Sequence, residues 1–291
     1  MPTNGQPEQH DYAIRTWRYL RLAMVALVVG LFAAVLLQWS KAPGGCFQAS
    51  ISAYYYTPVR PFFVAALLAI GVCLVCLRGN TDPEDVLLNV AGVAAAVVGL
   101  VPTTHIGTCM SVPVGEHDGV RDVIASNVAN NVFALLVTGA AGLLVFAVLV
   151  GWRAWRRRMM PLPSTVLAFA SALLAEVAAV FVFYVWRDFS IAHAHTAAAL
   201  VLFACIFVVV SLNAAAHWDG RRWLRNTYVS IASGMALAFL VVGVVALLSS
   251  WQHATLVIEG VFITLFAVFW GVQTHELWSA GLRPRRASST S

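Results

Sequence analysis

The residues best suited to binding or catalysis gather in one short segment, residues 50–60. It reads Ser-Ile-Ser-Ala-Tyr-Tyr-Tyr-Thr-Pro-Val-Arg and lies between the first two apolar runs of the chain. Tyrosines and an arginine at a point where the chain would re-enter a bilayer are typical of a membrane–water interface. We therefore expect this segment to form the floor or lid of a polar pocket, with the remaining chain as its scaffold.

Other polar residues are expected at the same end of the molecule. Glu259 lies early in the last apolar run, and an ionisable residue inside a span costs about 2.5 kcal/mol or more, so such residues commonly mark functional sites. Arg60 or His195 is its expected partner. The predicted ligand-binding residues are Tyr54, Tyr55, Tyr56, Arg60, His195 and Glu259.

Three histidines are the candidate metal ligands. His193 and His195 would project about 200° apart on a continuous helix and could not share a metal ion there. In an extended segment both could join His105 around a catalytic zinc with one open position. The interpretation that we favour is that these histidines are solvated or hydrogen-bonded at the interface, without a metal.

The five cysteines fall into two groups. Cys73, Cys76 and Cys205 lie within apolar runs and are expected to be small core residues, because they lack the exposed, electropositive setting of reactive thiols. Cys46 and Cys109 lie in connectors predicted to be outside the cytoplasm, where disulfides persist. We predict a Cys46–Cys109 bridge that holds the first outer loop against the second.

The elements that must position these residues are membrane-spanning helices. Of 291 residues, 60% are hydrophobic and only 11% are charged, whereas soluble domains have about 25% charged residues. The apolar runs are long and continuous, which favours helices of about 20 residues over barrel strands. We expect one all-α domain, residues 19–278, between a polar head (1–18) and a basic tail (279–291). Its eight spans are predicted near 19–39, 61–77, 86–102, 127–152, 163–186, 195–213, 227–250 and 255–278.

Basic residues predict the orientation of this bundle. Of the 18 Lys and Arg residues, 14 fall on one side, and only Lys41, Arg60, Arg121 and Arg187 fall on the other. The positive-inside rule then places both termini in the cytoplasm. The net charge of +5 suits anionic lipid, and the aromatic–basic interleaving that single-stranded nucleic acids require is not evident.

Acidic and amide residues elsewhere suggest two further sites. Glu176, near the middle of the fifth predicted span, would be either a protonated carboxyl bonded to a neighbour such as Thr138 or a proton or cation site. On the cytoplasmic side, polar residues are expected to cap helices and balance the arginine-rich loops; they include Glu84, Asp85 and Asn213. His275 and Glu276 begin like a zinc-protease motif, but Ser279 replaces the required second histidine.

Several segments together resemble a known family. They are residues 50–60, 63–71, 85–92, 101–103, 225–228 and 269–270, with His195 and Glu259. This set resembles a bacterial family of multispan membrane proteins of unknown function, over most of the chain from residue 50 to residue 278. The resemblance implies the bacterial cytoplasmic membrane as the location.

More distantly, the chain is similar in style to the alkaline ceramidase and adiponectin-receptor superfamily of membrane hydrolases. That similarity implies Ser52 and Asp85 as catalytic residues, with His105, His193 and His195 around zinc. The sequence lacks the H-x-x-x-H of that superfamily's last span, and Asp85 falls on the cytoplasmic side.

These observations lead to three expectations for function. The first is a non-catalytic membrane protein with an outward-facing cavity for a lipid or other amphipathic ligand, with no cofactor. The second is a zinc-dependent membrane hydrolase of a lipid amide or ester, and the third is a proton-coupled transporter. Expected partners are membrane lipids, and a second copy or another membrane protein in the bilayer, rather than nucleic acid.

Overall fold

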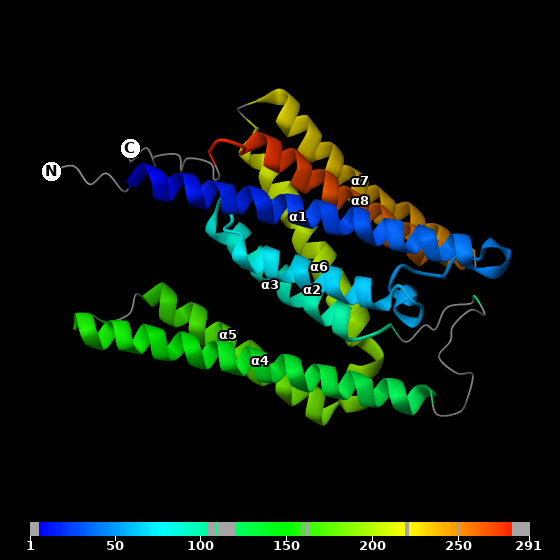
Figure 1. Cartoon of the computed structure of the whole chain (residues 1–291), viewed down its shortest axis with the longest axis horizontal. Helices are drawn as coiled ribbons and strands as arrows, with labels where there is room; N and C mark the ends of the chain where they lie inside the picture. The colour runs from blue at the N-terminus through cyan, green and yellow to red at the C-terminus, as the bar shows by residue number, and fades with distance from the viewer. Residues whose placement is uncertain are drawn as a thin grey trace. The chain divides into compact units, whose positions relative to one another are not determined.

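The computed structural model describes residues 6–103, 109, 120–158, 160, 163–218, 221–249 and 251–280, and all its regular elements in these ranges are helical (Figure 1). Two short 3₁₀ helices, η1 (Pro43–Gly45) and η2 (Ser52–Tyr56), follow the first helix. The α-helices are α1 (Gln6–Lys41), α2 (Arg60–Cys76), α3 (Asp82–Leu100), α4 (Val120–Arg157), α5 (Pro163–Val185), α6 (Arg187–Ala216), α7 (Arg222–Leu248) and α8 (Ala254–Glu276).

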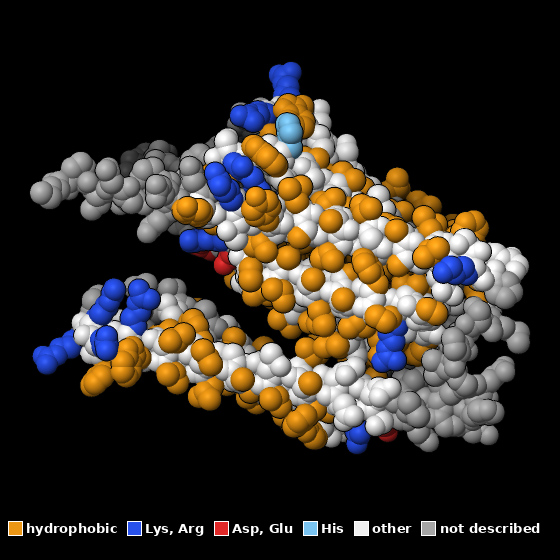
Figure 2. Space-filling model, viewed as in Figure 1, with side chains coloured by type: hydrophobic (Ala, Val, Ile, Leu, Met, Phe, Trp, Pro, Cys, Tyr) orange, Lys and Arg blue, Asp and Glu red, His pale blue; other side chains and the backbone are white. Residues whose placement is uncertain are grey.

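The helices have the length and composition of membrane spans. Seven of them, all but α2, contain segments long and apolar enough to cross a membrane, which indicates a membrane protein. Helix α2 is also apolar but has only 17 residues, about 26 Å at 1.5 Å per residue. Hydrophobic side chains cover the lengths of the helices, whereas Lys and Arg lie toward their ends (Figure 2).

The chain divides into two compact units. Unit 1 comprises Met1–Gly99, Thr103–Gly115 and Thr196–Ser291, and thus contains α1, α2, α3, most of α6, α7 and α8. Unit 2 comprises Leu100–Pro102 and Glu116–His195, and contains α4, α5 and the first turns of α6.

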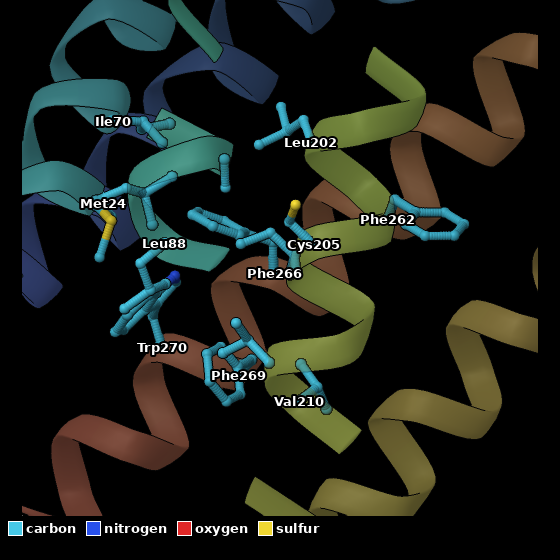
Figure 3. Packing of buried hydrophobic residues seen from close by; sticks show 14 of the residues in the cluster. Met24, Ile70, Leu88, Leu202, Cys205, Val210, Phe262, Phe266, Phe269 and Trp270 are labelled. Atoms are coloured by element: carbon cyan, nitrogen blue, oxygen red, sulfur yellow. The ribbon is translucent and has the colours of Figure 1, made fainter. Parts of the chain in front are cut away.

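The core of unit 1 is built by side chains from all six of its helices. Phe266, Phe269 and Trp270 of α8 meet Met24 of α1 and Leu88 of α3 there (Figure 3). Aromatic rings bury large apolar areas, and each contributes about 2–3 kcal/mol when fully buried. This packing fixes the positions of the helix ends, which carry the polar residues described below.

Helices α2 and α3 approach each other closely at a pair of glycines. A Cβ atom on Gly71 would lie 2.7 Å from the carbonyl oxygen of Gly92, and one on Gly92 would lie 2.6 Å from that of Gly71. Ala91 and Ala95 of α3 are fully buried beside this contact. Only small residues permit such backbone proximity between apolar helices.

Several helices begin before the predicted spans: α1, α4, α6 and α7 each do so by five residues or more. Helix α6 begins at Arg187 rather than at His195, because residues 187–194 contain no glycine or proline and Ser190 N donates to Trp186 O at 2.8 Å. Helix α1 begins at Gln6, well before the apolar run, since helix formation does not require apolar residues. The predicted spans coincide with apolar helices, but they do not give the helix ends.

Contacts in unit 1 define its two ends. At one end, Arg18 of α1 donates to Trp278 O and lies over the Trp278 ring, 4.7 Å from its centroid. At the other end, Leu256 N of α8 donates to Ala49 O at 3.0 Å. Cys46 and Cys109 are joined by a disulfide with a Cα–Cα distance of 5.8 Å, which is the pairing expected from the sequence.

Candidate functional site

The segment singled out in the sequence forms a helical turn that is capped by Glu259 of α8. The Glu259 carboxylate accepts hydrogen bonds from Ile51 N at 2.6 Å, Ser52 N at 3.1 Å and Ser52 Oγ at 2.9 Å. Ser50 Oγ accepts another from Ala53 N at 2.9 Å. The first N–H groups of any helix lack intrahelical partners. The Glu259 carboxylate and the Ser50 hydroxyl accept hydrogen bonds from these groups at the start of η2, and the Glu259 bonds also connect η2 to α8.

The Glu259 carboxylate is bound by backbone N–H groups and a serine hydroxyl. Arg60, one of the two partners expected from the sequence, instead lies over the Tyr55 ring and donates to its hydroxyl. Backbone and hydroxyl donors stabilise a partly buried carboxylate without a cation, and the positive end of a helix favours negative charge. Glu259 thus has an evident structural role at this end of unit 1.

The three tyrosines of η2 point into the protein. Tyr54, Tyr55 and Tyr56 are only 1%, 4% and 5% exposed. The Tyr56 hydroxyl donates to Thr103 O at 2.6 Å, and burial raises the pKa of the Tyr54 and Tyr56 phenols above its ordinary value. A ligand at the surface would therefore meet the edge of this turn rather than its rings.

Arg60 is the exposed member of this group. Its guanidinium lies over the Tyr55 ring, 4.3 Å from the centroid, and its Nη2 donates to the Tyr55 hydroxyl at 2.7 Å. Among the residues that the structure describes, no carboxylate pairs with it. The first residue of α2 thus presents an oriented positive charge beside the apolar surface of that helix.

Two of the three candidate metal ligands lie on one helix. His193 and His195 lie on the continuous helix α6, so the extended segment that a shared metal would need is not present. His195 is buried in unit 2 with Nδ1 2.6 Å from Val101 O, whereas His193 is exposed and stacks on Phe189 at 4.4 Å. His105 lies outside the described residues. Within the described part, no three His, Cys, Asp or Glu residues are grouped to hold a metal.

The residues that the hydrolase similarity implied as catalytic lie at opposite ends of α3. Asp85 accepts a hydrogen bond from Gly79 N at 2.9 Å at the start of the helix. Ser52 belongs to η2, which contacts Thr103 beyond the end of the same helix through Tyr56. From Asp85 to Leu100 the helix rises about 22 Å, so Ser52 and Asp85 do not act as a pair.

A second polar cluster lies at the end of unit 1 where α3 begins. Glu84, which is 2% exposed, accepts hydrogen bonds from Asn80 N at 3.0 Å, Asn80 Nδ2 at 3.2 Å and Asn213 Nδ2 at 3.1 Å. Gln273 Nε2 lies 3.5 Å from Glu84 Oε1 and donates to Asn213 Oδ1 at 3.1 Å. Amide side chains from α6 and α8 therefore surround a buried carboxylate of α3.

This cluster continues to the ends of α6, α7 and α8. His217 Nδ1 lies 2.8 Å from Asn213 O, and His217 Nε2 lies 2.9 Å from Glu276 Oε1. The fully buried Tyr228 donates from its hydroxyl to Glu276 Oε2 at 2.6 Å. The side chains of His217 and Glu276 are 10% and 6% exposed, so little water reaches their contact.

Sequence reasoning did not identify this cluster as a unit. It interpreted Glu84 and Asn213 as helix caps, and Glu84 does meet Thr81 at the start of α3, where Glu84 N donates to Thr81 Oγ1 at 3.3 Å. The available signal was Asn213 and Gln273, two amides at the inner ends of apolar runs, where each needs a partner. Glu276 was noticed only as part of a rejected zinc-protease motif, and His217 gave no signal, because polar residues are common at span ends.

Glu176 lies in unit 2 and packs against α4. A Cβ atom on Gly139 would lie 2.6 Å from Glu176 Oε2, so the glycine provides the space that this carboxyl occupies. A hydrogen bond from Glu176 to Thr138 is not found among the described residues: the Thr138 hydroxyl donates to Ala134 O of its own helix at 2.8 Å, and Glu176 Oε1 is buried without a partner. The transporter interpretation of Glu176 stays a prediction.

No family model matches the chain, and no curated protein or solved structure is significantly similar to it. The family resemblance inferred from the sequence stays a prediction.

Proposed function

We propose that this protein spans the bacterial cytoplasmic membrane eight times with both termini in the cytoplasm, and that it binds an anionic lipid or similar amphipathic ligand at its outer end without catalysing a reaction. The observation that carries the proposal is the exposed Arg60 guanidinium, held over Tyr55 at the start of an apolar helix. The eighth span is α2.

The orientation is supported by charge and by the disulfide. In unit 1, the end containing Arg18 and Trp278 also contains most of the basic residues, whereas Lys41 and Arg60 lie toward the other end. The positive-inside rule assigns the first of these ends to the cytoplasm. The Cys46–Cys109 bond is at the second end, in agreement with an oxidising compartment there.

The chemistry of Arg60 favours an anionic headgroup. Arginine binds phosphate through a planar set of donors, and the amide groups at a helix start add partial positive charge. One nitrogen is already bonded to Tyr55, which fixes the orientation of the guanidinium and leaves its other N–H groups for a ligand. The apolar surface of α2, with exposed Phe62 and Val72, is suited to contact the acyl chains of the same lipid.

The test is quantitative lipid analysis of the purified protein. Wild type and Arg60→Gln are extracted from membranes in the same mild detergent, and the anionic lipid that remains bound is measured by mass spectrometry. We expect several-fold less anionic lipid in Arg60→Gln. Tyr55→Phe should give a smaller loss, since it removes the hydroxyl that orients the guanidinium but keeps the ring beneath it.

The matched control is Lys41→Gln. Lys41 is exposed and lies in the last turn of α1, so this change removes one positive charge from the same end of unit 1. We expect Lys41→Gln to retain wild-type amounts of anionic lipid. Equal losses in Arg60→Gln and Lys41→Gln, or none in either, would contradict a site at Arg60.

A further inference from the structure

The end of α4 carries positive charge that its own unit does not balance. Arginines cluster at the last turn of the helix and directly after it: Arg153, Arg156, Arg157 and Arg158. No Asp or Glu occurs in the sequence between Asp122 and Glu176, so neither this end of α4 nor the start of α5 supplies a carboxylate. Among the described residues, no ion pair involves these arginines. Figure 2 shows Lys and Arg side chains at this end of the helix, next to hydrophobic ones.

The side chains at this helix end are ordered around its axis. Successive residues of an α-helix are about 100° apart, so Arg153, Arg156 and Arg157 fall within an arc of about 100°. Trp152 and Trp155 lie together beside this arc, with ring centroids 5.8 Å apart. The Arg156 guanidinium lies over the Trp152 ring, 4.9 Å from its centroid. All five side chains are exposed, so a positive surface adjoins an aromatic one.

An apolar face of α4 leads to Trp152. Val145, Val148 and Leu149 lie one to two turns before it on the same face, because the four positions follow the i, i+3, i+4, i+7 spacing. These three side chains are 57%, 58% and 62% exposed, and Trp152 is 54% exposed. The α4 stripe, which we define as these four residues and Arg156, therefore presents apolar side chains, then an indole ring, then an oriented guanidinium.

We propose that the α4 stripe binds an anionic phospholipid. An acyl chain would lie along Val145, Val148 and Leu149, the glycerol region would lie beside Trp152, and the phosphate would meet Arg156. If both termini are cytoplasmic, as proposed above, this lipid belongs to the cytoplasmic leaflet, whose anionic lipids attract basic clusters. The inference is separate from the site at Arg60, which is on α2 of unit 1 and would hold a lipid of the outer leaflet.

The chemistry of the stripe favours a lipid phosphate. The guanidinium is planar and binds phosphate through several donors at once, and its stacking on Trp152 restricts its orientation before a ligand arrives. Tryptophan is enriched where hydrocarbon meets headgroups. The neighbouring Arg153 and Arg157 add positive charge, which attracts an anionic headgroup but not a zwitterionic one. The apolar residues add binding energy only when the phosphate carries acyl chains.

The test locates the bound lipid by photo-crosslinking. The full chain is reconstituted into phosphatidylcholine vesicles that contain a small fraction of a probe with a diazirine in its acyl chain. The probe is phosphatidylglycerol in one sample and phosphatidylcholine in the other, and labelled peptides are identified by mass spectrometry. We expect several-fold more labelling of residues 145–152 by the phosphatidylglycerol probe, and equal labelling by the two probes would overturn the inference. A lipid at Arg60 would instead label α2, so the two sites can fail separately.

The decisive variant is Arg156→Lys. It keeps the charge, and thus the positive-inside balance, but loses the planar group stacked on Trp152. We expect phosphatidylglycerol labelling of α4 to fall about two- to fivefold, which corresponds to the loss of an exposed cation–π contact. Arg156→Gln, which also removes the charge, should lower it further. The matched control is Arg222→Lys, the same change at an exposed arginine of α7, and it should label as the wild type does.

Misfolding is checked by melting the same variants. Because the Arg156 side chain is exposed, both of its variants should melt within a degree or two of the wild type. Wild-type labelling in both Arg156 variants, or an equal loss in Arg222→Lys, would overturn the inference and leave the α4 stripe as ordinary lipid-facing surface. Inorganic phosphate, compared with chloride at equal ionic strength, should not reduce labelling; if it did, the site would recognise phosphate without the lipid, and the proposed ligand would be wrong.

Discussion

Removal of the Glu259 carboxylate should measure what fastens η2 to α8. In Glu259→Ala, three donors lose their acceptor: Ile51 N, Ser52 N and Ser52 Oγ. A buried donor left unpaired costs about 1–3 kcal/mol. Ile51 and Ser52 are buried, but Glu259 itself is only partly so, and we take the low end of the range. The expected loss is about 3 kcal/mol.

Glu259→Gln separates geometry from charge. The glutamine oxygen can accept from both backbone N–H groups while its amide donates to Ser52 Oγ, so only the charge assistance is lost. We expect about 1 kcal/mol for this change, since a charged acceptor roughly doubles the strength of a hydrogen bond. Replacement of the neighbouring exposed Thr264 by Ala should have no effect beyond about 0.5 kcal/mol.

The assay is thermal unfolding in detergent. For a chain of this size, 1 kcal/mol corresponds to a Tm change of about 2–4 °C. The expected decreases are therefore about 6–12 °C for Glu259→Ala and about 2–4 °C for Glu259→Gln. If both variants melted within a degree or two of Thr264→Ala, the carboxylate would not hold η2, and our account of this end of the molecule would be wrong.

Two more predictions follow from close packing and from burial. Gly92→Ala should destabilise unit 1 by about 1–3 kcal/mol, because its Cβ atom would lie 2.6 Å from Gly71 O. Gly142→Ala, which has open space around its Cβ position, should be neutral or stabilising in the same melting assay. Burial raises the pKa of the Tyr54 and Tyr56 phenols, so their contribution to stability is complete below the unfolded value of about 10 and is lost as pH rises further. Phenolate absorbance of the folded protein should show Tyr54 and Tyr56 titrating only above the ordinary value of about 10, or on unfolding; titration of both at that ordinary value in the folded protein would contradict their burial.

The sequence predicted those features that depend only on the apolar run or connector in which a residue lies. Apolar run length predicted membrane helices, and the predicted location of two connectors outside the cytoplasm suggested the Cys46–Cys109 pair. Contacts between distant segments could not be predicted in this way. Glu259 and Ser52 are 207 residues apart, and Glu84 and Gln273 are 189 apart. Their pairing depends on which helix packs beside which, and apolar periodicity does not encode that order.

The same inability to predict contacts between distant segments explains why Tyr54, Tyr55 and Tyr56 were assigned to a ligand pocket, although they are buried. Tyrosine has an apolar body and a polar tip, so it is as well suited to a membrane surface as to an interior with one bonding partner. The local sequence cannot distinguish these environments. Thr103, which provides the partner of Tyr56, is 47 residues away and follows the end of a different helix.

Contacts between the first and last parts of unit 1 have a consequence for biosynthesis. Helix α1 is anchored through Arg18 to Trp278, and the η2 segment is fastened to Glu259 of α8. These partners leave the ribosome long after α1 and η2, because the paired residues are 260 and 207 positions apart. The helices made first therefore lack their final neighbours during synthesis, and η2 lacks the Glu259 carboxylate that accepts its N–H groups. Helix α8 completes both ends of the bundle at once, so a nascent chain arrested before α8 would leave this unit open to quality-control proteases however well its earlier helices had inserted.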